Sequence, residues 1–560
     1  MKWTALMLAL LLSLNSYGQI VHQDMSDPDA CRVGDRYYLT HSSFNLSPGL
    51  PVYESQDLHH WTLVGYALTR VPNADYERGG SPAVKHGRCV WAPSIRHHDG
   101  RFYIYWGDPD YGIYMTQAED VRGPWTEPVL VVAGRGMIDP CPLWDETTGR
   151  LYLVHAWAAS RAHINSALCV LELSADGTRA ISQPRLVYDG TYDTPVPLVR
   201  NRVVATQLKG QTNHTVEGPK LYQRDGWYYI FAPAGGVAQG WQLAMRSRSV
   251  YGPYESRVVL AQGSTDVNGP HQGAWVESAE GRGYFLHFQE KQPYGRILHL
   301  QPLSWRDGWP VMGNEGEASP QPPPEEGERD SAFNIALQSA FVSSGRTSQC
   351  DDRRAWCPPS FGGGWGEASF FQWHANYEPL FGFASNLGFQ RIYSHEQTAD
   401  ETNLWTVPNL WTQAFPAETF TFTTELNVVA KDEANRSGLL VMGWDYCHYA
   451  LRLRGDVFEL VQVCCRDAEQ GNPETTTVLT TLRPTRIAPT GNTTNTECHL
   501  WMRVRCDAGG VCHFAYSLDG KKYIDSGQPF QAREGKWIGA RVGLCSVTRE
   551  GTQRGWVDCY

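Results

Sequence analysis

A strand–turn–strand phrase that occurs five times before residue 314 constrains the fold of this chain more than any other feature. Each copy opens beside a proline or a glycine and continues through a Gly-containing turn into an apolar strand rich in aromatic residues. The copies open at Asp27, Ala92, Asp139, Glu217 and His271. Self-similar β units spaced by roughly 50–80 residues are typical of propeller blades. The repeat therefore predicts an all-β fold that begins with a five-bladed β-propeller.

The composition changes where the repeats end. Residues 314–333 are rich in proline and glutamate, which is typical of a stiff, charged linker. Beyond it the helical period is absent and alternating strands are expected at 419–428, 438–442, 449–453, 457–463, 500–504 and 513–518. We therefore expect a propeller over residues 19–313, a linker over 314–333 and a β-sandwich over 334–560. Within the sandwich, Trp373 and Trp405 are either core residues, which we favour, or a ligand platform.

Charge and cysteine usage exclude several classes of function. The chain of 560 residues carries a net charge of -11, which disfavours nucleic acid and anionic membranes as partners and suits a neutral substrate. The 14 cysteines contain no paired CxxC spacing, which argues against a zinc site. Disulfides are expected in the second half in an oxidising compartment, for example between Cys350 and Cys357.

The first 18 residues have the pattern of a secretory signal peptide. Met1-Lys2 is followed by an apolar run that is too short to span a bilayer, and then by small residues up to Gly18. We expect cleavage after about Gly18. The mature protein is therefore expected to be secreted or periplasmic, without insertion into a membrane.

The residues that open the repeats predict a functional site. The innermost strands of a propeller run in the same direction along the central channel, so residues in equal register form a ring at one depth. Asp27, Asp139, Glu217 and His271 would then meet at one end of the channel. Carboxylates placed together separate each other's pKa values. The alternative is ordinary turn chemistry at each Asp-Pro or Glu-Gly-Pro, which we do not favour for all three carboxylates together.

At these three carboxylates the chain resembles glycoside hydrolase family 43. The supporting motifs are Asp27-Pro28, Gly34-Asp35-Arg36-Tyr37-Tyr38, Trp91-Ala92-Pro93-Ser94, Asp139-Pro140, Glu217-Gly218-Pro219 and Gly295-Arg296 with Trp305 and Gly308-Trp309-Pro310. Members of the family are five-bladed propellers that act on polysaccharides containing arabinose and xylose. The second domain looks like the concanavalin A-like β-sandwich that many members carry.

The resemblance implies a role for each candidate residue. Asp27 would be the general base, Glu217 the general acid, and Asp139 the residue that orients the acid and tunes its pKa. These roles agree with the chemistry of an inverting glycosidase, which needs one ionised and one protonated carboxyl group. The resemblance also implies pocket residues: Phe44 and Trp91 would stack on the terminal sugar, with hydrophobic packing as the alternative, and Arg296 would donate to sugar hydroxyls.

For His271 two interpretations stay open. The resemblance implies a histidine near a central, structural calcium ion, with water completing a shell that imidazole alone serves poorly. The alternative is a hydrogen-bonded histidine of the channel. We favour the calcium site.

The leading hypothesis is an exo-acting, inverting glycosidase that releases α-L-arabinofuranosyl or, as the less favoured sugar, β-D-xylosyl units from neutral plant polysaccharides or oligosaccharides. One alternative is a carbohydrate-binding propeller without catalysis, which would give no reason for three carboxylates in register. Another is a retaining hydrolase of the fructan-cleaving kind, which needs its carboxylates about 5–5.5 Å apart. The start Ser26-Asp27-Pro28-Asp29 lacks the Asn-Asp-Pro-Asn phrase of that class.

Overall fold

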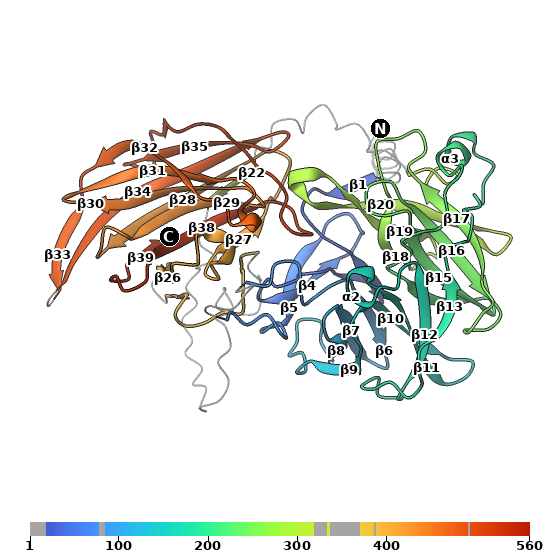
Figure 1. Ribbon diagram of the computed structural model, residues 1–560. Helices are drawn as coiled ribbons and strands as arrows, with labels where there is room; N and C mark the ends of the chain where they lie inside the picture. Colours follow the sequence, from blue (N-terminus) through green and yellow to red (C-terminus); the bar gives the residue numbers. More distant parts are fainter. Residues whose placement is uncertain (1–17, 78–83, 319–332, 337–369, 386–387, 491–492) are drawn as a thin grey trace, which may run out of the picture.

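The computed structural model describes residues 18–77, 84–318, 333–336, 370–385, 388–490 and 493–560. The predicted signal peptide, apart from Gly18, and the predicted Cys350–Cys357 pair lie outside these residues. Twelve described cysteines are unpaired thiols. The described residues form two all-β bodies, a propeller and a sandwich, which lie side by side in Figure 1. No helix within the described ranges is long and apolar enough to cross a membrane.

Four blades of the propeller are four-stranded antiparallel sheets whose strands follow sequence order. Blade 1 contains β2 (Asp29–Val33), β3 (Arg36–Thr40), β4 (Gly49–Ser55) and β5 (Thr62–Leu68), and blade 2 contains β6 (Pro93–His98), β7 (Arg101–Asp108), β8 (Gly112–Ala118) and β9 (Val129–Ala133). Blade 3 contains β10 (Met137–Asp145), β11 (Arg150–Trp157), β12 (Ala167–Leu173) and β13 (Arg185–Asp189), and blade 4 contains β14 (Lys220–Arg224), β15 (Trp227–Ala234), β16 (Trp241–Ser247) and β17 (Glu255–Ala261).

The fifth blade closes the ring with the beginning of the chain. It consists of β18 (His271–Glu277), β19 (Gly283–Glu290), β20 (Arg296–Arg306), β21 (Trp309–Met312) and β1 (Gly18–Val21). Strand β1 pairs antiparallel with β20, so residues about 280 positions apart share one sheet. The five-bladed propeller expected from the repeats is confirmed. Short helices α2 (Ala159–Ala162), α3 (Arg202–Gln207) and η1 (Gln292–Tyr294) lie in the loops.

The Asp-Gly pairs of the repeated phrase are two-residue hairpin turns. Asp99 and Gly100 join β6 to β7 with φ of 47° and 74°, and Asp225 and Gly226 join β14 to β15 with φ of 50° and 70°. Two consecutive residues with positive φ make the turn that matches the twist of the strands, and Asp-Gly adopts it at little cost. The strand that follows packs between neighbouring blades; in β7, for example, Ile104 and Trp106 are buried.

The sandwich consists of two large sheets. One contains β24 (Gly382–Ala384), β25 (Gln390–Tyr393), β39 (Trp556–Cys559), β28 (Phe420–Ala430), β34 (Thr493–Asp507), β35 (Val511–Ser517) and β36 (Ile524–Asp525), with β22 (Phe333–Ala336), β33 (Arg486–Thr490) and β37 (Phe530–Gln531) at its sides. The other contains β23 (Gln372–Trp373), β27 (Trp411–Ala414), β38 (Arg541–Arg549), β29 (Arg436–Met442), β30 (Tyr446–Arg454), β31 (Val457–Cys465) and β32 (Thr475–Leu482), with β26 (His395–Gln397) beside β38.

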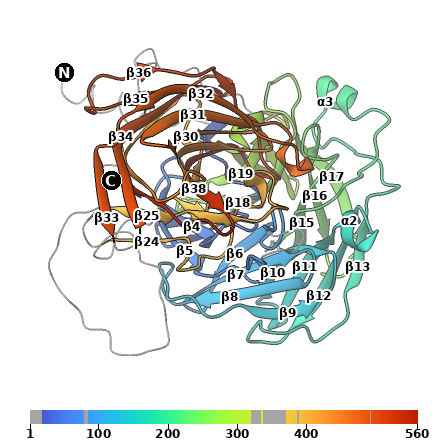
Figure 2. The ribbon, with the colours of Figure 1, turned by 60° about the vertical axis from the view of Figure 1, so that its left-hand side comes forward.

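The faces of the two sheets enclose the core of the sandwich. Leu439 on β29 and Leu500 on β34 are fully buried in it. Figure 2 shows β30, β31 and β32 side by side over the other strands. Turns η2 (Leu404–Thr406) and η3 (Ala468–Gln470) complete the domain. Trp373 and Trp405 are buried, as the favoured core interpretation expects.

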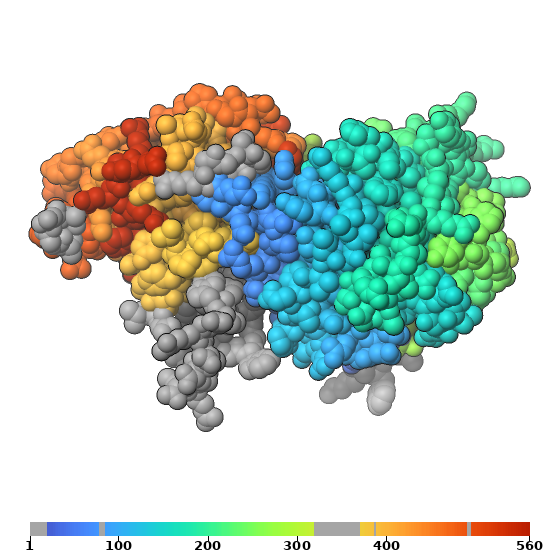
Figure 3. Space-filling model, turned by 60° about the horizontal axis from the view of Figure 1, so that its bottom comes forward, coloured from blue at the N-terminus to red at the C-terminus, as the bar shows by residue number. Residues whose placement is uncertain are grey.

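The sandwich is attached to blade 1 by hydrogen bonds at backbone level. Ser47 and Trp373 exchange two backbone hydrogen bonds of 3.0 and 2.8 Å. The Asn45 side chain donates to the carbonyl of His374 at 2.8 Å, and the side chain of Asn376 accepts from the backbone of Val71 at 2.8 Å. Figure 3 shows this part of the sandwich, in yellow, against the blue first blade. The two domains therefore meet near the loop that follows β3.

Candidate active site

The turn before each inner strand places the candidate residues. Asp27 and Asp139 both have φ of 56°, and in the last two blades Gly218 and Gln272 have φ of 57° and 37°. A proline or glycine follows each of these four positions. Gly218 and Gln272 are therefore the positions equivalent to Asp27 and Asp139. Glu217 and His271 each lie one residue earlier, so the prediction that all four residues share one register was wrong. Asp tolerates a left-handed backbone better than most residues. In blade 4 Gly218 takes the left-handed position, and the longer side chain of Glu217 comes from the preceding residue.

Asp27 accepts a hydrogen bond at each of its carboxylate oxygens. It is 5% exposed, and its Oδ1 accepts from Arg296 Nη1 at 2.8 Å. Its Oδ2 accepts from Ser42 Oγ at 2.6 Å. Charge-assisted hydrogen bonds of this kind stabilise the charged form of a buried acid. Arg296 was predicted from the sequence as a sugar donor, and the structure places it on the candidate base.

Asp139 and Glu217 form a coupled pair across blades 3 and 4. The backbone N–H of Gly218 donates to Asp139 Oδ2 at 2.7 Å, which ties the loop of Glu217 to Asp139. Burial, followed by the charges of Glu217 and Asp27, raises the pKa of Asp139 well above its ordinary value. The three carboxylates predicted to meet do so. Because buried like charges resist joint ionisation, such a pair retains a proton at a higher pH than an isolated carboxyl group.

The Glu217 side chain, 27% exposed, is the more accessible member of the pair and is held by His271. His271 Nε2 lies 2.8 Å from Glu217 Oε1, and the ring is fully buried. This contact is the one expected if His271 is a hydrogen-bonded histidine of the channel.

The residues around His271 fit a calcium ion poorly. Its Nδ1 is buried without a partner, which leaves one nitrogen for a ligand. Among the described residues no group of three or more His, Cys, Asp or Glu side chains is arranged to hold a metal ion. Calcium prefers six to eight oxygen ligands, so an ion here would take most of its shell from water and backbone oxygens. Calcium at His271 stays a prediction.

The predicted aromatic residues lie at the junction of blades 1 and 2. Phe44 has φ of 52° and exchanges backbone hydrogen bonds with Val90, which brings it next to Trp91. Phe44 is 2% exposed, whereas Trp91 is half-buried and donates from Nε1 to the carbonyl of Gly87 at 2.9 Å. The guanidinium of Arg161 on α2 lies 5.9 Å from the Trp91 ring.

The sandwich contributes an aromatic residue that the sequence did not reveal. Trp537, 46% exposed, lies with its ring 6.5 Å from that of Trp91 and 5.7 Å from the guanidinium of Arg296. Its carbonyl accepts from Ser26 Oγ at 3.0 Å, one residue before the candidate base. No local signal connects a loop of the second domain with a residue more than 500 positions earlier.

A buried charged cluster lies deeper in the channel. Lys220, fully buried on β14, donates to the carbonyl of Pro93 at 2.8 Å and lies 3.9 Å from Asp29. Asp29 also accepts from Arg96 at 2.5 Å. The charge of Lys220 favours the ionised form of Asp139, against the stronger effects that raise the pKa of Asp139. Lys220 and Ser42 were not predicted as site residues. Lys220 follows Glu217 by three residues, and Ser42 reaches Asp27 across the hairpin of β2 and β3.

Comparison with known sequences matches both domains to described families. Residues 19–310 match Glycosyl hydrolases family 43, and residues 368–559 match the Beta xylosidase C-terminal Concanavalin A-like domain. A putative beta-xylosidase of Xylanibacter ruminicola is 32% identical over 527 residues, which cover 93% of this chain and 85% of the relative. A beta-xylosidase of Formosa agariphila is 25% identical over 94% of this chain and 86% of its own length.

Other comparisons concern one domain or the fold alone. A non-reducing end alpha-L-arabinofuranosidase of Bacteroides ovatus is 32% identical over 52% of each chain. Among solved structures, xylan beta-1,4-xylosidase from Bacillus halodurans aligns with a TM-score of 0.73 at 18% identity, over 97% of this chain and 99% of that one. At this identity the alignment shows a shared fold. With the family match over the whole propeller and the first relative spanning both domains, this chain is a glycosidase that belongs to glycoside hydrolase family 43.

Proposed function

We propose that this enzyme removes single α-L-arabinofuranosyl or β-D-xylosyl units from the non-reducing ends of plant polysaccharides or oligosaccharides, with inversion at the anomeric carbon. The observation that carries the proposal is the unequal environment of three carboxylates from three blades. Asp27 is held by Arg296 and Ser42, whereas Asp139 and Glu217 form a pair that resists double ionisation. Relatives named as beta-xylosidases and an arabinofuranosidase support the choice of sugars.

In the proposed mechanism Asp27 is the general base. Arg296 and Ser42 each donate to one of its oxygens, and its remaining lone pairs can accept a proton from water placed opposite the leaving group. As that water attacks the anomeric carbon, its proton passes to Asp27 and its oxygen becomes the new anomeric hydroxyl. Arg296, which remains buried beside Asp27, stabilises the carboxylate before the transfer.

Glu217 is the proposed general acid. The pair with Asp139 retains one proton, and Glu217, as its exposed member, gives this proton to the glycosidic oxygen when the bond breaks. Asp139 then stays as the buried partner that sets the protonation of the acid and, through the Gly218 N–H, its position. Trp91 and Trp537 provide aromatic surface beside the carboxylates for the sugar ring.

Hydrolysis of two aryl glycosides tests the proposal. The wild type and Asp27→Ala are assayed on an aryl α-L-arabinofuranoside and an aryl β-D-xyloside, with NMR detection of the first anomer released. We expect turnover by the wild type, an inverted product, and a loss of about 10³-fold or more in the variant. A retained anomer would contradict the mechanism. Binding of xylo- and arabino-oligosaccharides without turnover would favour a non-catalytic carbohydrate-binding protein.

We also propose that the protein is exported. The proposal is supported by the basic start, the short apolar run and the small residues of the first 18 positions. N-terminal sequencing of protein recovered from the periplasm or medium of an expressing bacterium tests it, with a mature chain expected to begin near Gln19. A cytoplasmic protein that keeps Met1 would contradict export.

A further inference from the structure

Asp24 is a buried carboxylate outside the three proposed for catalysis. It lies between β1 and β2 and is 8% exposed. Its Oδ1 accepts from the backbone N–H of Arg296 at 2.8 Å and from Ser26 Oγ at 3.0 Å. Its Oδ2 accepts from the backbone N–H of Gly539 at 3.1 Å. One side chain thus joins the N-terminal segment, the start of β20 and a loop of the sandwich.

The three segments meet too closely for side chains. A Cβ on Gly295 would lie 2.5 Å from the nitrogen of Gly539 and 2.6 Å from Asp24 Oδ1. A Cβ on Gly539 would lie 2.7 Å from the carbonyl carbon of Tyr294. All three distances are shorter than nonbonded contacts of a carbon atom allow, so the start of β20 and the sandwich loop touch through their backbones. Asp24 supplies the acceptor for the N–H groups on both sides of this contact.

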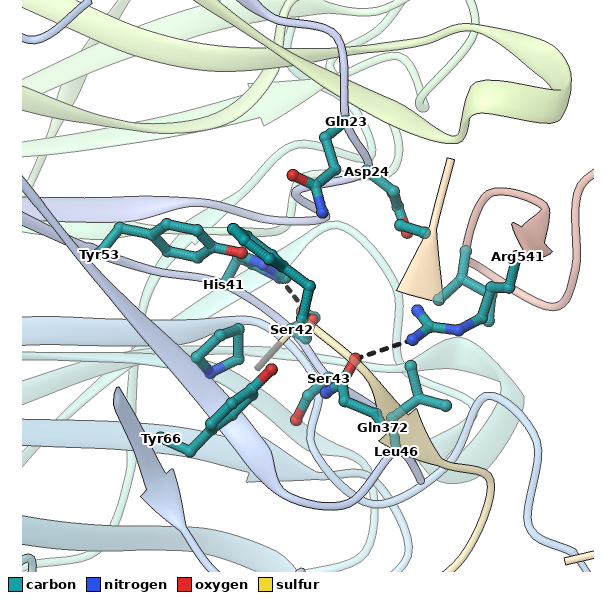
Figure 4. A pocket seen from close by; sticks show the side chains of 14 residues that line it. Gln23, Asp24, His41, Ser42, Ser43, Leu46, Tyr53, Tyr66, Gln372 and Arg541 are labelled. Carbon is teal, nitrogen blue, oxygen red and sulfur yellow. Dashed lines mark hydrogen bonds between the residues drawn. The ribbon is translucent and has the colours of Figure 1, made fainter. Parts of the chain in front are cut away.

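A buried, charged residue of the sandwich, Arg541, faces Asp24. Figure 4 shows the side chains of Asp24 and Arg541 directed into one polar cavity between blade 1 and the sandwich. Arg541 is 4% exposed and donates to Thr412 and Gln372. Among the described residues it has no carboxylate within 4.0 Å. Burial lowers its pKa to about 10, and the charge of Asp24 is the first of the effects that oppose this.

Keeping the Asp24 carboxylate in this place is costly. Burial raises the pKa of Asp24, although four hydrogen-bond and charge contacts oppose the shift. If the role of Asp24 were only structural, a neutral side chain could accept the same hydrogen bonds. Buried charges rarely make a fold more stable than neutral groups of the same shape do. The Asp24 carboxylate instead accepts from the backbone N–H of Arg296, the residue whose guanidinium holds Asp27.

We propose that Asp24 is a positioning residue of the reaction: its carboxylate binds the sandwich loop to the backbone of Arg296 and so keeps the Arg296 guanidinium on the general base. The inference rests on the proposed role of Asp27. It makes the sandwich part of the machinery that prepares the base, because Gly539 and Arg541 belong to the second domain. Asp24 itself is not assigned a contact with the substrate.

Asp24→Asn tests the proposal in the full chain. Asn keeps the shape of Asp but has a single acceptor oxygen, so it cannot accept from the N–H groups of both Arg296 and Gly539 as Asp24 does. We expect kcat/KM at neutral pH to fall about tenfold. We also expect the low-pH limb of the kcat/KM profile to move up by about half a unit or more, because the ionised base loses part of its support. Ser26→Ala, a milder change at the same junction, is expected to act in the same direction and less strongly.

Asp145→Asn is the matched control. Asp145 ends β10 of blade 3, far along the chain from the junction, is 1% exposed, and accepts hydrogen bonds from Thr148 in the same blade and from Tyr228 in blade 4. We expect it to lower the thermal midpoint without moving the pH profile. The groups around Asp24 that can titrate or carry charge are Arg296, His41, Tyr53, Tyr66 and Arg541. None of them is changed in any of the three variants.

Two outcomes would overturn the inference. One is an Asp24→Asn protein with kcat, KM and pH profile equal to those of the wild type. The other is a uniform fall in kcat at every pH that follows the loss of folded protein, as in the control. Both differ from failure of the proposed function itself, in which wild type would show no turnover or Asp27→Ala would retain it.

Discussion

At the scale of single residues, the buried carboxyl group of Asp139 is needed for the proposed reaction but lowers the stability of the fold near neutral pH. Its raised pKa means that the folded protein holds the Asp139 proton more tightly than the unfolded chain does. Between the ordinary pKa of 3.8 and the raised value, the free energy of unfolding therefore falls as pH rises. The carboxylate is tolerated because the proposed reaction needs it, which is typical of strained active sites.

Asp139→Asn is accordingly expected to inactivate the enzyme and stabilise the fold. Asn can still accept the Gly218 N–H, but it carries no charge to repel Glu217 and Asp27. The gain in thermal midpoint should be small near pH 4 and grow toward pH 7, because the wild type loses stability over that interval. Calorimetry across this range measures it. A gain that is constant with pH, or a loss at pH 7, would contradict the coupled ionisation.

Substrates with different leaving groups test whether Glu217 is the general acid. In Glu217→Gln the amide cannot supply a proton, so hydrolysis of a xylo-oligosaccharide is expected to fall by about 10²–10⁴-fold. A dinitrophenyl glycoside, whose leaving group needs no protonation, should lose far less. Steady-state kinetics on both substrates provide the measurement. Equal losses on the two substrates would show that Glu217 does not act as the acid.

At the scale of elements, the turn that leads into blade 4 depends on Gly218, which lies against Gln272 at the start of blade 5. A Cβ there would lie 2.7 Å from Cγ of Gln272, and φ is +57°. Gly218→Ala is expected to destabilise the protein by about 2–3 kcal/mol and to lower kcat, because Glu217 must move with the turn. Urea unfolding and kinetics test this.

Gly100→Ala provides the comparison for that element. Gly100 has a similar φ of +74°, but nothing lies within 4 Å of its Cβ position. It should show only the backbone cost of about 1–2 kcal/mol and unchanged kcat. If the two alanine variants lose the same stability and keep the same kcat, the contact with Gln272 does not position Glu217.

At the scale of the whole molecule, the sandwich completes the surface around the carboxylates. Trp537 reaches Trp91 and Arg296 from the second domain. Trp537→Ala is expected to raise KM by about three- to tenfold through lost ring stacking, with a small change in thermal midpoint because the side chain is 46% exposed. Tyr192→Ala, at a residue 88% exposed in the propeller, is the control and should leave KM unchanged. An unchanged KM in Trp537→Ala would place the sugar elsewhere.

The repeats were sufficient to predict the five blades and the meeting of Asp27, Asp139 and Glu217, and the alternating strands after the linker were sufficient to predict the sandwich. A period of strands with Asp-Gly turns is local information, since turn chemistry and alternation are read from neighbours along the chain. The closure of blade 5 by β1 was not predictable in this way, because it depends on a pairing between Gln19 and His299.

Only the tertiary structure decided how the site is held. The nearly equal φ of Asp27 and Gly218 shows that Glu217 lies one residue before the position of Asp27. The sequence already contains this offset, because the proline follows Asp27 directly but follows Glu217 only after Gly218. Asp24 and Trp537 reach Arg296 through contacts over long sequence separations. Ser42 reaches Asp27 within the hairpin of β2 and β3. The sequence by itself determined which carboxylates would gather, because they open equivalent strands. Their protonation and support were decided by burial and by partners from other blades and the second domain, which exist only once the chain has folded.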